Sequence, residues 1–166
     1  MTSQKSGPKF TPLKILNTRE KTEIEEKLRE QFGIEEIPGT LIKRGKERIF
    51  LYNGFLEKRD IKRLEKLVII ERAGIYFAKI VFGEDGEIRL SLEGTQILKD
   101  KIKRNVYNLN KKQAEEWMKG GELRIKTGRR GFLVMKYGED FLGCGKASAE
   151  KIGNFIPKNR RLKRKG

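Results

Sequence analysis

The side chains able to do chemistry are few in this chain, and none stands in a recognisable catalytic pattern. Its 166 residues include one cysteine, Cys144, and no histidine. Histidine is the side chain most often used as a general base and metal ligand, so the usual acid–base residue is missing. Cys144 lies between two glycines in "GCGK". Those neighbours favour a small, buried filler over a nucleophile.

The same "GCGK" does not complete a phosphate-binding loop. That loop needs a glycine five residues before the second one, and a Ser or Thr after the lysine. Asp140 and Ala147 occupy these two positions. The aspartates at 60, 85, 100 and 140 lie beside predicted turns or helix starts, where capping explains them. The sequence therefore predicts no catalytic residues, no metal site and no cofactor.

The charge of the chain points instead to an anionic partner. Lys and Arg number 39 against 23 Asp and Glu, a formal charge of +16. Residues 119–166 hold fourteen of the basic and four of the acidic residues, a surplus of ten. So many positive side chains repel one another, and binding to nucleic acid would offset that repulsion. For any single lysine a solvated, solubilising surface is the simpler interpretation, whereas the whole cluster favours nucleic acid.

The elements that must position these charges begin with a predicted α/β part. Asn17 and Glu20 form a capping-box pattern, and apolar residues every four positions predict a helix that ends at Gly33. Residues 39–54 contain two apolar runs around "RGKE" and predict a hairpin. Residues 57–68 have helical spacing.

The next stretch, residues 67–91, is rich in β-branched and aromatic residues and predicts strands joined by a turn at Asp85 and Gly86. Ser91 can then cap a short helix.

The C-terminal part changes from helical to strand periodicity. After the short strand "NVYNL", Asn110 and Gln113 predict a capped helix. Four short apolar runs follow Gly121, separated by turns that contain glycine: "ELRIK", "GFLVMKYG", "FLGCGKAS" and "IGNFIPK". Such regular short strands predict a small closed or nearly closed barrel.

The fold class is therefore α+β, with an α/β domain before a barrel. The predicted boundaries are a disordered tail at 1–14, the α/β domain at 15–100, the barrel at 101–162 and a basic tail at 163–166.

Several of these segments resemble a known RNA-binding module. They are "GEIRLSLEGTQILKD", "NVYNLNKKQAEEWMKGGEL", "GFLVMKYGEDFLGCGKAS" and "IGNFIPKNRRL". Together they resemble the PUA module, named for pseudouridine synthase and archaeosine transglycosylase, over about Gly86 to Leu162. The likeness is above all to small archaeal PUA proteins related to the tails of fmu/Sun-type RNA cytosine-5 methyltransferases, which are associated with ribosome biogenesis. It implies a pseudo-barrel whose turn glycines bring the backbone close to RNA.

The charge pattern and the resemblance together give a set of predicted RNA-binding residues. The resemblance implies that Gly143 and Gly145 allow a tight turn presenting Lys146, and that Asn154 binds backbone or phosphate. The full set is Arg129, Arg130, Lys136, Gly143, Gly145, Lys146, Lys151, Asn154, Lys158, Arg160, Arg161 and Lys163. Phe155, Tyr137 and Phe141 are candidates for stacking on bases, with filling of the barrel as the alternative.

We therefore expect a non-catalytic, cytoplasmic RNA-binding protein that acts on structured ribosomal RNA, or on transfer RNA, in RNA modification or ribosome biogenesis. Its expected partners are RNA and either an RNA methyltransferase or a pre-ribosomal particle, with no membrane. The alternatives are an accessory RNA-docking subunit of a modifying enzyme and a ribosome-associated structural protein. A methyltransferase is disfavoured, because no glycine-rich methyl-donor loop follows a predicted strand. No segment has the apolar length of a signal peptide or membrane span.

Overall fold

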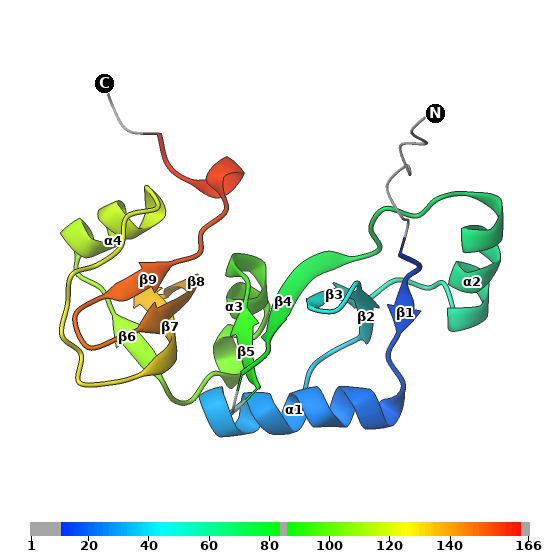
Figure 1. Cartoon of the computed structure of the whole chain (residues 1–166), viewed down its shortest axis with the longest axis horizontal. Helices are drawn as coiled ribbons and strands as arrows, with labels where there is room; N and C mark the ends of the chain where they lie inside the picture. The colour runs from blue at the N-terminus through cyan, green and yellow to red at the C-terminus, as the bar shows by residue number, and fades with distance from the viewer. Residues whose placement is uncertain (1–10, 84–85, 164–166) are drawn as a thin grey trace, which may run out of the picture.

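The computed structural model describes residues 11–83 and 86–163, and its described part contains two β-sheets (Figure 1). The first sheet has five antiparallel strands in sequence order. They are β1 (Lys14–Ile15), β2 (Thr40–Arg44), β3 (Arg48–Tyr52), β4 (Ile75–Val81) and β5 (Glu87–Leu90). With the helices that cover it, this sheet forms the predicted N-terminal α/β part, and the α+β fold class is confirmed.

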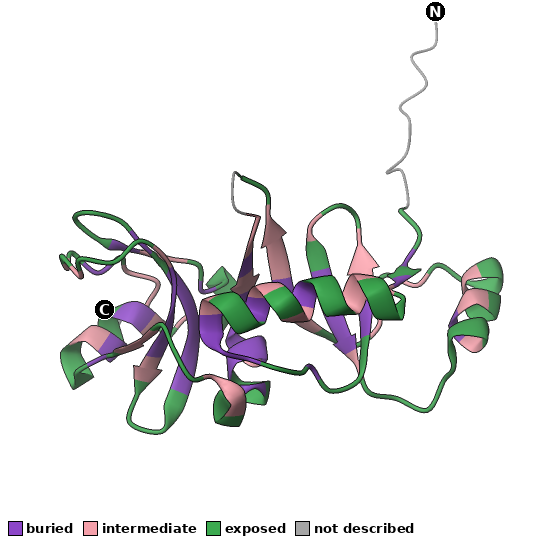
Figure 2. Ribbon diagram, turned by 90° about the horizontal axis from the view of Figure 1, so that it is seen from below, coloured by how far each residue is buried: buried purple, intermediate pink, exposed green. Residues whose placement is uncertain are grey.

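Local capping signals set the first helices. α1 (Thr18–Phe32) begins at the Asn17–Glu20 capping box and ends at Gly33, whose φ of 72° is left-handed. Its buried residues Ile24, Leu28 and Phe32 pack against the first sheet. Its exposed residues point away from that sheet, as the green part of α1 in Figure 2 shows. α2 (Lys58–Leu67) begins after Glu57 and lies at the right-hand end of Figure 1. Both predicted helices are confirmed.

The second sheet has the strand order β6-β7-β8-β9. Its strands are β6 (Val106–Asn108), β7 (Gly131–Tyr137), β8 (Asp140–Ala147) and β9 (Ile152–Asn154). β6 is parallel to β7, and the other pairs are antiparallel. The helix α4 (Lys111–Met118) follows β6 and starts at the predicted Asn110–Gln113 capping box. Two 3-10 turns, η1 (Lys99–Lys101) and η2 (Lys158–Arg160), complete the described chain.

Three predicted features differ from the structure. Among the described residues, β6 and β9 do not pair, so no closure of the barrel is seen. The run "ELRIK" makes a single bridge, between Leu123 and Ile152, instead of a strand. Residues 68–74 have no regular structure, and β4 begins only at Ile75. The apolar side chains of Val68 and Ile69 are exposed there and do not pack against the sheet.

The N-terminal tail also differs from its prediction where it is described. Leu13 is buried, its N–H donates to Glu65, and Lys14 begins β1. Residues 1–10 of the predicted disordered tail, Asp85 of the predicted turn and residues 164–166 of the basic tail lie outside the described residues. No helix of the described part is long and apolar enough to cross a bilayer.

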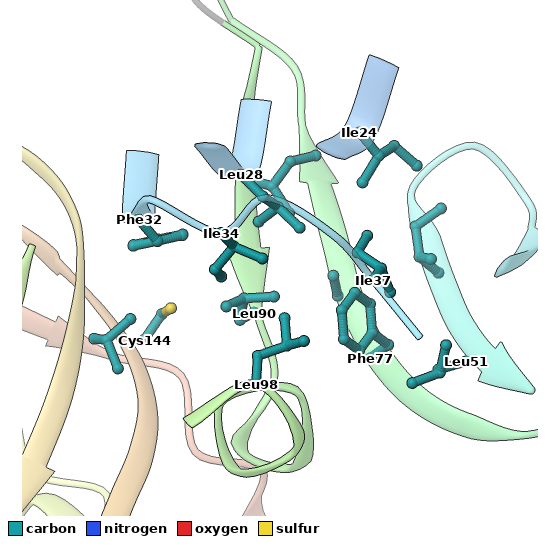
Figure 3. Close-up of a cluster of buried hydrophobic side chains, with 14 of the residues drawn as sticks. Ile24, Leu28, Phe32, Ile34, Ile37, Leu51, Phe77, Leu90, Leu98 and Cys144 are labelled. Carbon is teal, nitrogen blue, oxygen red and sulfur yellow. The ribbon is translucent and has the colours of Figure 1, made fainter. Parts of the chain in front are cut away.

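The two sheets share one hydrophobic core. Figure 3 shows Cys144 of β8 beside Phe32 of α1 and Leu90 of β5, and all three belong to one buried cluster. The helix α3 (Leu92–Ile97), capped by Ser91 as predicted, lies between the sheets (Figure 1). The hydroxyl of its buried Thr95 accepts a hydrogen bond of 3.0 Å from the N–H of Gly143. The C-terminal sheet is thus fixed to α3, the helix between the sheets, by a polar contact inside apolar surroundings.

Candidate nucleic-acid interface

The two glycines of β8 pack the sheet against helices. Gly145 lies under the indole of Trp117: a Cβ there would come within 2.7 Å of Trp117 Cη2 and 2.5 Å of Ile152 Cγ2. Gly143 has a φ of +78° and lies against the backbone of Leu92 in α3. Both glycines are buried inside the strand. The predicted tight turn at these glycines is therefore wrong, because both are buried within the strand β8.

Lys146 is presented by strand alternation instead. Its neighbours in β8 are buried while its own side chain is about half exposed. The ammonium lies 3.2 Å from a carboxylate oxygen of Glu87 in β5 and 5.0 Å from the ring centre of Phe132. Such an exposed ion pair contributes little to stability, so a phosphate can compete for the lysine.

Asn154 binds backbone groups of the protein, which is one of its two expected roles. Its side-chain amide donates to the carbonyls of Trp117 and Gly121, at 2.8 and 2.9 Å. Its side-chain oxygen accepts from the N–H of Ile156 at 2.8 Å. These bonds tie the end of α4 to β9, in line with the expected contact to backbone, and engage both ends of the amide within the protein.

The chain after β9, residues 157–163, is here called the exit segment. The N–H of Leu162 donates to the carbonyl of Met118 at 2.8 Å. The Arg161 guanidinium donates to the carbonyl of Ile156 at 2.9 Å and covers Gly120. Arg160 pairs with Glu93 of α3 at 2.7 Å. The exit segment is thus held to α4 and α3, and it carries the exposed side chains of Lys158, Arg160 and Lys163 on a fixed backbone.

The remaining predicted cations occupy two opposite ends of the second sheet. Arg129 and Arg130 precede β7 and, because Gly131 pairs with Ala147, lie at the same end as Lys151. Lys151 pairs with Glu122 at 2.7 Å. Lys136 is at the other end of β7, 5.2 Å from the ring centre of Phe141. The predicted set therefore does not lie on one face: the exit segment holds four of the cations, and the others, Lys146 included, are divided between the two ends of the sheet.

The aromatic candidates also separate. Phe141 is 7% exposed and fills the core, whereas Tyr137 and Phe155 are each 39% exposed. Phe155 packs on Phe132 with ring centres 6.0 Å apart, and the Arg89 guanidinium lies 4.2 Å from its ring centre. Sequence reasoning missed Arg89. Its signal is its place between the apolar Ile88 and Leu90, which directs a strand residue to the opposite face.

The thiol of Cys144 is not in a reactive setting. It is 3% exposed, and burial raises its pKa to about 12. Since the thiolate is the nucleophilic form, little of it exists at neutral pH. The interpretation of Cys144 as a small filler is confirmed by its place in the shared core. In the part of the chain that the structure describes, His, Cys, Asp and Glu form no group of three able to hold a metal ion.

Comparison with known families identifies the C-terminal module. Residues 104–162 match a family model of PUA domains, so this part of the chain is a PUA domain. The model is described as the methyltransferase RsmF PUA domain, which relates this domain to the tails of RsmF/Sun-type methyltransferases. The match spans the second sheet, α4 and nearly all of the exit segment. No curated protein gives a significant match to the chain. A PUA domain of this type suggests RNA binding.

Proposed function

We propose that this chain is a non-catalytic RNA-binding protein that acts on structured ribosomal RNA, or on transfer RNA, in RNA modification or ribosome biogenesis. The match of residues 104–162 to a PUA domain carries the proposal. The ordered exit segment supports it, because cations on a fixed backbone bind phosphate without first being immobilised. The buried thiol of Cys144 supports a role without catalysis, since the cytosine-5 chemistry of related enzymes needs an accessible thiolate.

The exit segment provides the test. A variant carrying Lys158→Gln, Arg160→Gln and Lys163→Gln removes three exposed charges and leaves Arg161, which packs on Gly120, in place. We expect it to bind a blunt RNA hairpin about tenfold or more weakly than the unmodified chain. The slope of log affinity against log salt should flatten by roughly 2, because fewer counterions are released.

The matched control removes three exposed charges from α2 at the other end of the molecule: Arg59→Gln, Arg63→Gln and Lys66→Gln. We expect this variant to keep the hairpin affinity and slope of the unmodified chain. An equal loss in both variants would show that net charge alone attracts RNA, and would contradict a site on the exit segment.

A second candidate is an RNA-docking subunit of an RNA methyltransferase. Exposed apolar side chains around α2 favour it: Phe55 is 95% exposed, Leu67 80% and Ile69 68%. Exposed apolar side chains can mark contact with another protein, and the matched domain is described as part of a methyltransferase. Stable copurification of a methyltransferase with the tagged chain would support this role. Tight RNA binding by the isolated chain would count against it.

A further inference from the structure

A row of basic side chains crosses the first sheet. Arg44 pairs with Arg48, Arg48 with Lys79, and Lys79 with Arg89, across β2, β3, β4 and β5. These four residues are here called the cation row. Directly paired residues point to the same face with Cβ atoms about 5 Å apart, so their like charges repel and cost stability. With strands about 4.8 Å apart, the row is roughly 14 Å long.

The cation row lies on the face of the sheet opposite α1. The alternate residues Ile49, Ala78 and Leu90 point into the core that α1 covers. On the row's own face Glu47 pairs with Lys79 at 2.8 Å. That bond chiefly lowers the pKa of Glu47, and the nearby charges of Arg48 and Arg89 lower it further. A carboxylate in this position is therefore held ionised by the row, as a bound phosphate would be.

An open groove of about 1070 Å³ adjoins the row. It is lined by Arg44, Arg48, Arg72 and Arg89, with the rings of Phe50 and Tyr76 and with Glu71 among its other residues. The ring centres are 5.7 Å apart; Phe50 is buried, and Tyr76 is the ring that is partly exposed. Arginine presents a planar fork of donors that fits a phosphate, and an accessible aromatic ring can stack on a base. The groove thus combines the two kinds of side chain that hold a single RNA strand.

The groove continues to the PUA domain. Arg89, at the end of the cation row, lies over Phe155, which packs on Phe132, and Lys146 lies over Phe132 in turn. A smaller cavity shares Tyr76 and Arg89 with the groove and reaches Phe155 and Pro157 at the start of the exit segment. The groove and the cations of the second sheet therefore adjoin each other on one molecule with a shared core.

We propose that the groove on the first sheet is a second RNA-binding site. It holds the phosphates of a single-stranded segment that continues from the structured RNA bound by the PUA domain. This inference rests on the proposed function. It assigns a binding role to the N-terminal domain, for which the sequence indicated none.

Two RNAs and the full chain test the proposal: a blunt hairpin, and the same hairpin with a single-stranded oligouridine tail of about 16 nucleotides. The groove variant carries Arg44→Gln, Arg48→Gln and Arg72→Gln, and the control is the α2 triple variant defined above. We expect the unmodified chain and the control to bind the tailed hairpin about tenfold more tightly than the blunt one. The groove variant should lose this gain, flatten the salt slope for the tailed RNA by roughly 2, and bind the blunt hairpin normally.

The outcomes separate this proposal from the proposed function. If the unmodified chain binds the hairpin and the tail adds nothing, or if the groove variant keeps the gain, the groove is not an RNA site and the PUA function stands. If the unmodified chain binds neither RNA, the proposed function fails as well. Polyphosphate and polyglutamate serve as competitors. Displacement of the tail by either one at equal charge concentration would show a general anion site and overturn the assignment to RNA.

Discussion

Gly145 is a residue on which the close packing of the PUA domain depends. It allows β8 to approach both Trp117 of α4 and Ile152 of β9. The buried indole N–H of Trp117 donates to the carbonyl of Leu142 at 2.8 Å, which fixes the ring in that position. A side chain at residue 145 would have to displace either a fixed ring or the neighbouring strand.

Gly145→Ala should therefore lower the free energy of unfolding by about 1–3 kcal/mol, the usual cost of overpacking a core. Chemical denaturation measures this. Gly153→Ala is the matched control, because it lies in the neighbouring strand and its Cβ would meet only the Lys146 carbonyl at an ordinary 3.8 Å. Equal stability of the two variants would contradict the packing role assigned to Gly145.

At the scale of single elements, local signals predicted well and pairing signals predicted poorly. The capping boxes at Asn17 and Asn110 correctly predict where α1 and α4 begin, because capping involves residues three apart in the chain. Whether "ELRIK" forms a strand depends on a pairing partner distant in sequence, and in the described structure only Leu123 forms a bridge, with Ile152. The glycines of β8 were assigned to a turn, since the residue type alone does not distinguish a bend from close packing.

In the candidate site, too, residues close in sequence were predictable and residues brought together by strand pairing were not. The charge excess predicted the exit segment, whose four cations lie close together in sequence and are exposed except for the half-buried Arg161. The sequence did not predict the cation row because its members are spread over residues 44–89. They come together only through the register of β2, β3, β4 and β5. The hairpin turn "RGKE" contained part of this signal, since it sets Arg44 opposite Arg48.

Repulsion within the cation row gives a prediction about stability. Arg48 faces Arg44 on one side and Lys79 on the other. Arg48→Gln should therefore raise the free energy of unfolding by about 0.2–1 kcal/mol at low salt, by relieving like-charge pairs. The gain should shrink at high salt, where exposed charges are screened. Urea titrations at two ionic strengths measure it, with Arg59→Gln on α2 as control. A loss of stability at low salt would show that the row is held together by other contacts.

At the scale of the whole molecule, a shared buried cluster joins the two sheets. Phe132, Val134 and Cys144 of the second sheet belong to the same buried cluster as Phe32 and Leu90. The Thr95–Gly143 hydrogen bond adds a polar link at 0% exposure of the threonine. Exposing this shared surface by unfolding one sheet alone would cost the hydrophobic stabilisation of both. A rigid junction would also keep the groove and the exit segment at a fixed separation, as an RNA bound to both requires.

We therefore expect both sheets to unfold in one transition. The single tryptophan, Trp117, reports on the PUA domain, and far-ultraviolet circular dichroism reports on the whole chain. In a urea titration the two signals should give the same midpoint and slope. Thr95→Val leaves the buried N–H of Gly143 without its partner and should shift both midpoints together, at a cost of about 1–3 kcal/mol. A tryptophan transition that separates from the dichroism transition, in either protein, would show that the sheets are independent and that the distance between the two RNA sites is not fixed.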